Sequence, residues 1–127
     1  MDQADAEKLA QKIVSLDEGI FTSGIISNSG ETLGGYVRPS HRSRFPADKA
    51  GWATVDFKQA MVFGSAKGTN QMLSEIEAIV FIRKNSKQIL IWDQERGIIV
   101  AAIFDKSMNG TDLGKKIRAM LGLEKVT

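Results

Sequence analysis

The residues with the most chemical potential lie in one stretch, VRPSHRSRFP, at residues 37–46. It contains three arginines, the single histidine, both prolines and an aromatic residue. Guanidinium groups bind phosphates and carboxylates, and an aromatic ring can stack on a nucleic-acid base. The stretch is therefore a solvated loop, a loop that contacts a protein partner, or a nucleic-acid arm. The residues expected to make such a contact are Arg38, His41, Arg42, Arg44 and Phe45.

Other patterns that could support catalysis or metal binding are incomplete. A single histidine cannot supply the paired imidazoles of a zinc site, and a chain without cysteine has no thiolate ligand or cysteine nucleophile. The stretch GSAKGTN, at 64–70, lacks the G-x-x-x-x-G-K-[ST] spacing of a phosphate-binding loop. Glu75 and Glu77 are separated by one residue, so on a strand they point to the same face, as solvent-exposed or rim carboxylates. We expect no enzymatic activity, no metal and no cofactor.

Length and composition predict one ordinary globular domain that spans residues 1–127. The hydrophobic fraction is 43%, the charged fraction is 25% and the net charge is +2, which is a weak imbalance for a protein that binds duplex DNA. The start, MDQADAEKLAQ, is acidic and unlike a secretory signal, and the apolar runs are too short to span a bilayer. We expect a cytoplasmic protein.

The first half of the chain predicts a helix followed by a β-hairpin. Apolar residues recur at helical spacing over residues 3–18. Two apolar runs on either side of NSG predict strands over 20–27 and 31–37. Gly34 and Gly35 within the second strand predict a bulge, or a position where another backbone passes close by.

A second helical pattern begins at Asp48, which is a plausible N-cap. Ala60, Gly64 and Gly68 fall on one face of this pattern. Each glycine costs an interior helix position about 1 kcal/mol relative to alanine, and the close approach of another helix would explain that cost. In the alternative interpretation the helix ends near Gly64 and the glycine-rich segment is a loop.

The last half of the chain predicts three antiparallel strands and a helix. The runs EIEAIVFIRK, KQILIWD and GIIVAAIFDK are joined by connections short enough only for hairpins. They are apolar on both faces, which indicates that both faces of the sheet are covered. A helix over 110–122 follows, with Asn109 or Thr111 as its cap. The predicted fold class is α+β: a five-stranded antiparallel sheet with helices on both faces, in the order α-β-β-α-β-β-β-α.

This order, with the hairpin GIISNSGETLGG and the last strand GIIVAAIFD, resembles the roadblock domain of dynein light chains and its prokaryotic relatives. The chain also resembles small archaeal proteins of this type, and profilin-like and longin domains share the architecture. The resemblance covers nearly the whole chain. It implies a dimer formed through the third strand and second helix, which serves as a platform for small GTPases or motor subunits.

Carried over to this sequence, the resemblance makes EIEAIVFIRK the strand at the edge of the sheet. A long hydrophobic edge is an aggregation hazard, and pairing with a symmetry mate removes it. We expect Val80→Glu to break the dimer. The residues expected at the interface are Ile76, Ala78, Val80 and Ile82, together with Ala60, Gly64 and Gly68.

The sequence therefore favours a non-enzymatic, homodimeric regulatory or scaffold domain, with a small GTPase as one candidate partner. Roadblock domains generally bind GTPases without donating an arginine finger, so the arginines of 38–45 are not assigned that role. Two alternatives stay open. One is a small nucleic-acid-associated protein that uses residues 38–45. The other is a profilin-like domain that holds a small ligand between helix and sheet, although the apolar strands argue against a polar ligand.

Overall fold

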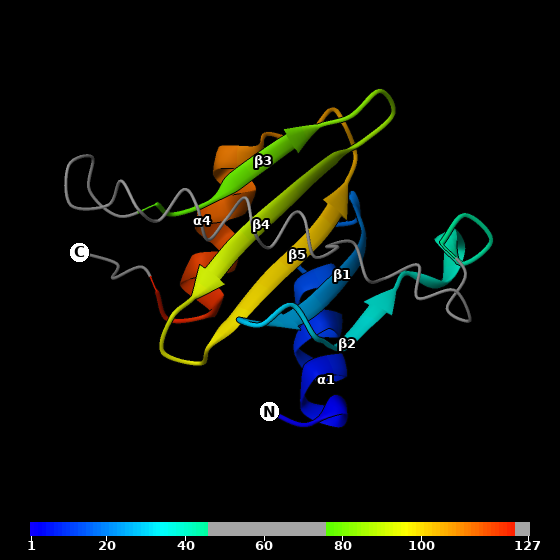
Figure 1. The fold of residues 1–127 in the computed structure, drawn as a ribbon. Coiled ribbons are helices and arrows are strands. Elements are labelled where there is room, and N and C mark those ends of the chain that lie inside the picture. The colour runs from blue at the N-terminus through cyan, green and yellow to red at the C-terminus, as the bar shows by residue number, and fades with distance from the viewer. Residues whose placement is uncertain (46–75, 124–127) are drawn as a thin grey trace.

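The computed structural model describes residues 1–45 and 76–123. Within these ranges the sheet has five strands in the order β2-β1-β5-β4-β3, and every neighbouring pair is antiparallel (Figure 1). The elements are α1 (Gln3–Val14), β1 (Ile20–Ser27), β2 (Thr32–Val37), the 3₁₀ turn η1 (Pro39–His41), β3 (Ile79–Ile82), β4 (Lys87–Asp93), β5 (Ile98–Phe104) and α4 (Gly110–Met120). The predicted α+β fold class with a five-stranded antiparallel sheet is confirmed.

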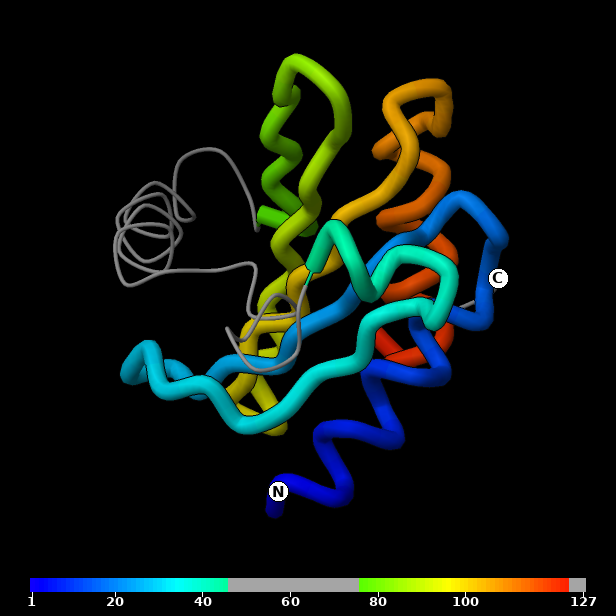
Figure 2. The backbone as a smooth tube through the Cα atoms, turned by 90° about the vertical axis from the view of Figure 1, so that its right-hand side faces the viewer, coloured from blue at the N-terminus to red at the C-terminus, as the bar shows by residue number. Residues whose placement is uncertain are grey.

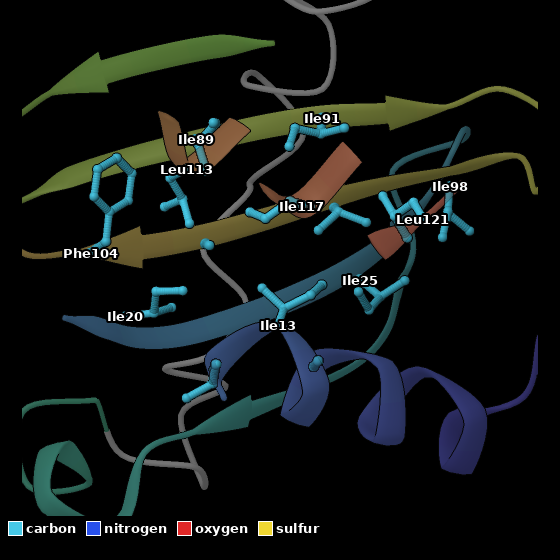
Figure 3. Packing of buried hydrophobic residues seen from close by; sticks show 14 of the residues in the cluster. Ile13, Ile20, Ile25, Ile89, Ile91, Ile98, Phe104, Leu113, Ile117 and Leu121 are labelled. Carbon is cyan, nitrogen blue, oxygen red and sulfur yellow. The ribbon is translucent and has the colours of Figure 1, made fainter. Parts of the chain in front are cut away.

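Helices α1 and α4 pack on the same face of the sheet (Figures 1 and 2). Helix α1 lies over β1 and β2, whereas α4 lies over β4. Between them, alternate residues of β1, β4 and β5 form one continuous apolar core, as the period of two along a strand requires. Figure 3 shows this core from close by. The labelled side chains are Ile13, Ile20, Ile25, Ile89, Ile91, Ile98, Phe104, Leu113, Ile117 and Leu121.

The other face of the sheet carries a second buried cluster. Ile26, Leu90, Ile99 and Ala101 are buried there, and partly buried side chains including Trp92 pack against them. The central strands are thus buried on both faces, which explains their continuous apolar runs. The predicted helix that begins at Asp48, with Ala60, Gly64 and Gly68, lies outside the described residues.

Both expectations for the glycines of the first hairpin are confirmed. Ile25 pairs with Gly34 and Ile26 pairs with Thr32, so Leu33 is the extra residue of a bulge. A Cβ atom at Gly34 would lie 2.8 Å from the Cβ of Ala6 and 3.1 Å from a backbone oxygen of α1. Glycine is required at this position because the backbone of α1 crosses the strand there.

The ends of the helices follow from local hydrogen bonds. The Asp2 carboxylate accepts the Asp5 N–H at 2.8 Å and caps α1, and this backbone bond holds the pKa of Asp2 below its ordinary value. Helix α1 ends at Val14 rather than at 18, because the Asp17 carboxylate accepts the Gly19 N–H at 2.8 Å and forms a turn that competes with the helix. Of the two candidate caps for α4, the structure uses Asn109.

Candidate functional site

The outer edge of β3 is the first candidate site. Strand β3 ends the sheet, and no strand among the described residues pairs with its outer side. On the inner side, the Arg83 N–H donates to the Ser86 carbonyl at 2.9 Å, which marks a hydrogen-bonded pair of the ladder with β4. Bonded and non-bonded pairs alternate along an antiparallel ladder. The backbone N–H and C=O groups of Val80 and Ile82 therefore point away from β4.

The same two residues expose apolar side chains. Ile82 is 72% exposed and Val80 is 39% exposed. Ile82 pairs with Lys87 and Val80 pairs with Ile89, which places both side chains on the α4 side of the sheet. An edge with outward-pointing backbone groups and exposed β-branched side chains is a template for pairing with another strand.

A groove of about 370 Å³ runs between β3 and α4 beside this edge. Val80 forms one wall, and a Cβ atom at Gly110 would lie only 3.0 Å from its Cγ2 atom. Val80 therefore also supports the packing of α4. Ile82 is not among the residues that line the groove. The groove is lined by Ile76, Glu77, Ala78, Val80, Gly110, Thr111, Gly114, Lys115 and Arg118.

The structure brings together those residues of the expected interface that it describes. Ile76, Ala78 and Val80 line the groove, and Ile82 continues the same edge. The regular strand is shorter than the run EIEAIVFIRK predicted, because it begins only at Ile79, so Glu77 lies before the strand rather than within it. Their role in a dimer stays a prediction.

In the arginine-rich stretch, the side chain of Arg38 has a structural role. Its Nε atom donates to the carbonyl of Ile20 at 2.9 Å, and its Nη2 atom donates to the carbonyls of Val14 at 2.6 Å and Asp17 at 2.8 Å. The Val14 carbonyl belongs to the negative end of the α1 dipole, where a cation is stabilising. Arg38 thus ties the end of α1 to the start of β1. Sequence reasoning missed this role, since nothing in the local pattern reveals carbonyls that lie far back in the chain.

Two further residues of the stretch, His41 and Arg44, contact Phe21, a buried residue of β1. The His41 ring lies 4.3 Å from the Phe21 ring, centroid to centroid. The Arg44 guanidinium lies 5.5 Å from the Phe21 centroid and 5.1 Å from the Phe45 centroid, within cation–π range. Arg42 and Arg44 are both exposed. The ring contacts thus serve the packing of this turn, and the contact role expected for the stretch stays a prediction.

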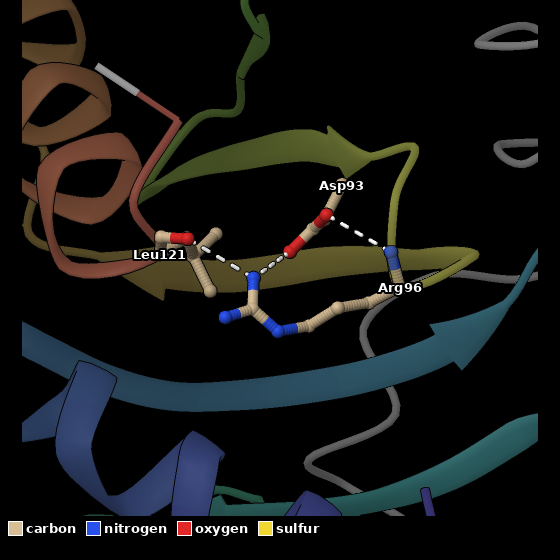
Figure 4. Close-up of polar contacts among 3 residues, drawn as sticks. All are labelled: Asp93, Arg96 and Leu121. Carbon is tan, nitrogen blue, oxygen red and sulfur yellow. Dashed lines mark hydrogen bonds and ion pairs between the residues drawn. The ribbon is translucent and has the colours of Figure 1, made fainter. Parts of the chain in front are cut away.

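An ion pair between a buried carboxylate and a half-exposed arginine, which sequence reasoning did not single out, joins the β4–β5 turn to α4 (Figure 4). The Asp93 side chain is fully buried, and its carboxylate pairs with the guanidinium of Arg96. Nη1 of Arg96 also donates to the Leu121 carbonyl at 3.0 Å, and the Arg96 backbone N–H donates to Asp93 at 3.2 Å. The spacing D-x-x-R in the turn WDQERG is the only sequence signal for it. This network fixes the end of α4.

The described residues hold no group of three histidine, cysteine or acidic side chains that could bind a metal ion. In the same residues, no helix is long and apolar enough to cross a membrane.

Comparison with known proteins identifies structures with a similar fold. No family model matches the chain, and no curated protein matches it. Among solved structures, the roadblock/LC7 domain from Streptomyces avermitilis superposes with a TM-score of 0.64 at 13% identity, over 95% of this chain and 92% of that one. The chain has the fold of roadblock/LC7 domains.

Two further structures support the roadblock and profilin likeness. MglB, solved in a tetrameric arrangement, has a TM-score of 0.64 at 14% identity, over 94% of this chain and 85% of that one. Profilin IB from Acanthamoeba castellanii has a TM-score of 0.55 at 11% identity, over 91% and 92%. The expected roadblock and profilin-like architecture is confirmed. The likeness to archaeal proteins stays a prediction.

Proposed function

We propose that this chain is a non-enzymatic domain that forms a homodimer through the outer edge of β3 and serves as a regulatory or scaffold platform for a protein partner. The observation that carries the proposal is the coincidence at Val80 and Ile82 of outward backbone groups with exposed apolar side chains. Pairing with one additional strand would bond these backbone groups and bury these side chains.

A twofold axis at Phe81 gives a consistent pairing. The two β3 strands then run antiparallel, and Val80 of each copy lies opposite Ile82 of the other. The outward N–H and C=O groups bond across the axis, and the two exposed isoleucine side chains are buried. Such an interface is isologous and closes on itself, so it stops at a dimer. The tetrameric arrangement of MglB, which has a similar fold, supports self-association as a general property of such domains.

A small GTPase is the partner class that the roadblock likeness implies. In this proposal the domain contributes a surface to the GTPase and no catalytic arginine, as the roadblock likeness implies. Arg38 in particular already binds three backbone carbonyls. The nucleic-acid alternative is less well supported, because Arg38 already binds backbone carbonyls, the His41 ring packs on Phe21 and the net charge is only +2. A polar ligand between helix and sheet is also less well supported, because apolar side chains fill the core beneath α1 and α4.

The dimer is tested by multi-angle light scattering on the wild type and on Ile82→Glu. At low micromolar concentration we expect a wild-type mass of twice 13.9 kDa and a monomer for Ile82→Glu. Ile82 is a cleaner site than Val80, because Val80 also contacts α4 at Gly110. Ala119→Glu introduces the same charge at an exposed position of α4 and is expected to stay dimeric. Wild-type protein that is monomeric up to about 100 μM, where an interface of even modest affinity would be populated, contradicts the proposal.

A second variant separates backbone pairing from side-chain burial. Ile82→Pro removes an N–H that points outward, so the ladder with β4 keeps its bonds while the intermolecular pairing loses one. We expect it to weaken the dimer with little change in the circular dichroism spectrum. The GTPase partner is tested by affinity capture on immobilised wild type, with a GTP analogue or GDP present. Retention of a GTP-binding protein with only one of the two nucleotides supports the GTPase partner. If no GTP-binding protein is retained with either nucleotide, the GTPase part of the proposal is wrong and only the proposed dimer is kept.

A further inference from the structure

A second and larger groove, of about 590 Å³, opens beside α1 on the helical face of the sheet. Leu16 and Met120 form its apolar floor and pack against the core beneath. Lys8 and Lys12 are exposed and stand along its side. The groove thus combines an apolar floor with a basic rim. Its lining residues are Lys8, Gln11, Lys12, Ser15, Leu16 and Met120.

The first turn of α1 and the two residues before it carry the opposite chemistry. Met1 is one of the exposed large apolar residues of the described chain, with 52% of its surface accessible, and Asp2 and Asp5 beside it are exposed. Asp5, Lys8 and Lys12 follow one another at spacings of three and four, so they lie along one face of the helix. This face is acidic and apolar at its start and basic beside an apolar floor at its end. Two copies of this face laid antiparallel therefore complement each other.

We propose that the groove beside α1 receives α1 of a second copy in antiparallel orientation. When the twofold axis passes between residues 8 and 9, Asp5 lies level with the partner's Lys12, and Met1 lies level with the partner's Leu16. Every contact is made twice, as an isologous interface requires. The exposed Met1 side chain then covers the apolar floor, and each Asp5 carboxylate meets a lysine of the rim.

This interface is separate from the one proposed at β3. Helix α1 packs on β1 and β2, whereas β3 is the opposite edge strand of the sheet. One chain can therefore use both surfaces at once, and the wild type is expected to associate beyond a dimer at high concentration. The two surfaces can also be broken one at a time.

The proposed pairing also predicts a repulsive contact at Lys8. The two Lys8 side chains lie closest to the axis, where like charges oppose each other. Association through α1 should therefore be weak and reversible, and Lys8→Gln should strengthen it. Removing a lysine that faced an acidic residue would weaken association. A strengthening by Lys8→Gln therefore tests whether the twofold axis passes beside residue 8.

The test is a charge swap measured by sedimentation velocity in the Ile82→Glu background, which removes the β3 contact. We expect Ile82→Glu alone to form a reversible dimer at high concentration. Raising NaCl from about 0.1 M to about 1 M, which shortens the Debye length from about 10 Å to about 3 Å, should dissociate it. Adding Lys12→Glu or Asp5→Lys places like charges opposite each other, and each variant should associate at least about tenfold more weakly.

An equimolar mixture of those two variants is the decisive sample. In the mixed pair, Asp5 of the first meets the partner's Lys12, and the glutamate at position 12 meets the lysine at position 5, so both contacts are again attractive. The mixture should recover the association that each variant lacks alone. Lys84→Glu, an exposed position in the β3–β4 turn with the same charge change, should have no effect.

Two results would overturn this inference. The first is that the Ile82→Glu variant sediments as a monomer at every concentration. The second is that the mixture of the two charge variants associates no better than either variant alone. Both outcomes leave the β3 dimer untouched, because that dimer is determined by comparing the wild type with Ile82→Glu. Conversely, a wild type that associates and is insensitive to Ile82→Glu but responds to the charge swap supports the α1 interface and contradicts the β3 dimer.

Discussion

Replacing Arg38 should destabilise the fold, whereas replacing its neighbour Arg42 should not. Arg38 donates to three backbone carbonyls, those of Val14, Asp17 and Ile20, and so joins the end of α1 to the start of β1. Arg42 lies four residues later and is exposed. The two substitutions Arg38→Met and Arg42→Met remove the same charge and keep a similar aliphatic stem.

The expected loss for Arg38→Met follows from those three bonds. A hydrogen bond from a charged donor contributes about 1.5–3 kcal/mol when it is shielded from water. Arg38 is half-buried, so water can take over part of its role, and the methionine keeps the packing of the stem. We expect the free energy of unfolding to fall by about 2–3 kcal/mol, which for a chain of this size corresponds to a Tm lower by roughly 6–15 °C.

Urea unfolding followed by circular dichroism measures the difference. Arg42→Met should lie within about 0.5 kcal/mol of the wild type, as is usual for an exposed substitution. Arg38→Lys should recover less than half of the loss, because an ammonium group keeps the charge but cannot span the three carbonyls as a guanidinium does. Equal stability of Arg38→Met and Arg42→Met would refute the structural role.

Two other substitutions test the packing around the candidate sites. Gly34→Ala should lower the free energy of unfolding by about 1–3 kcal/mol, because its Cβ would lie 2.8 Å from the Cβ of Ala6 and the adjacent α1 backbone cannot yield; a urea midpoint equal to that of the wild type would contradict the close crossing. Arg96→Met should cost about 2–4 kcal/mol, because it leaves the buried Asp93 carboxylate without its cation. The double variant Asp93→Asn/Arg96→Met should recover most of that loss in a double-mutant cycle, and a double variant no more stable than Arg96→Met would count against the ion pair.

Local pattern was enough for the elements of the sheet. The strands from Ile20 to Ser27 and from Ile98 to Phe104 were predictable because periodicity and turn residues act over a few neighbours. The demand for glycine at Gly34 was visible as well, since a glycine inside a strand indicates a bulge or a close backbone. The sequence could not say that α1 is the element that crosses there.

The two candidate surfaces differ in how far they were predictable. An apolar third strand with short hairpins after it was visible in the sequence, and the roadblock resemblance implied its place at the edge. The exposure of Ile82 and the outward backbone groups beside it required the register with β4. The groove beside α1 was not predictable, because its floor joins Leu16 to Met120, which lie at opposite ends of the chain.

The arginines show most clearly what the sequence by itself determined and what only the tertiary structure decided. Composition placed Arg38 and Arg42 together as candidates for contact with a partner, since both are arginines in one proline-bounded stretch. The fold separates them, because the acceptors of Arg38 lie 18 to 24 residues earlier in the chain and meet it only when β1 and β2 pair. Local sequence determines secondary structure through short-range sterics and periodicity. The role of a long polar side chain depends on which distant carbonyls the folded chain brings within hydrogen-bonding distance.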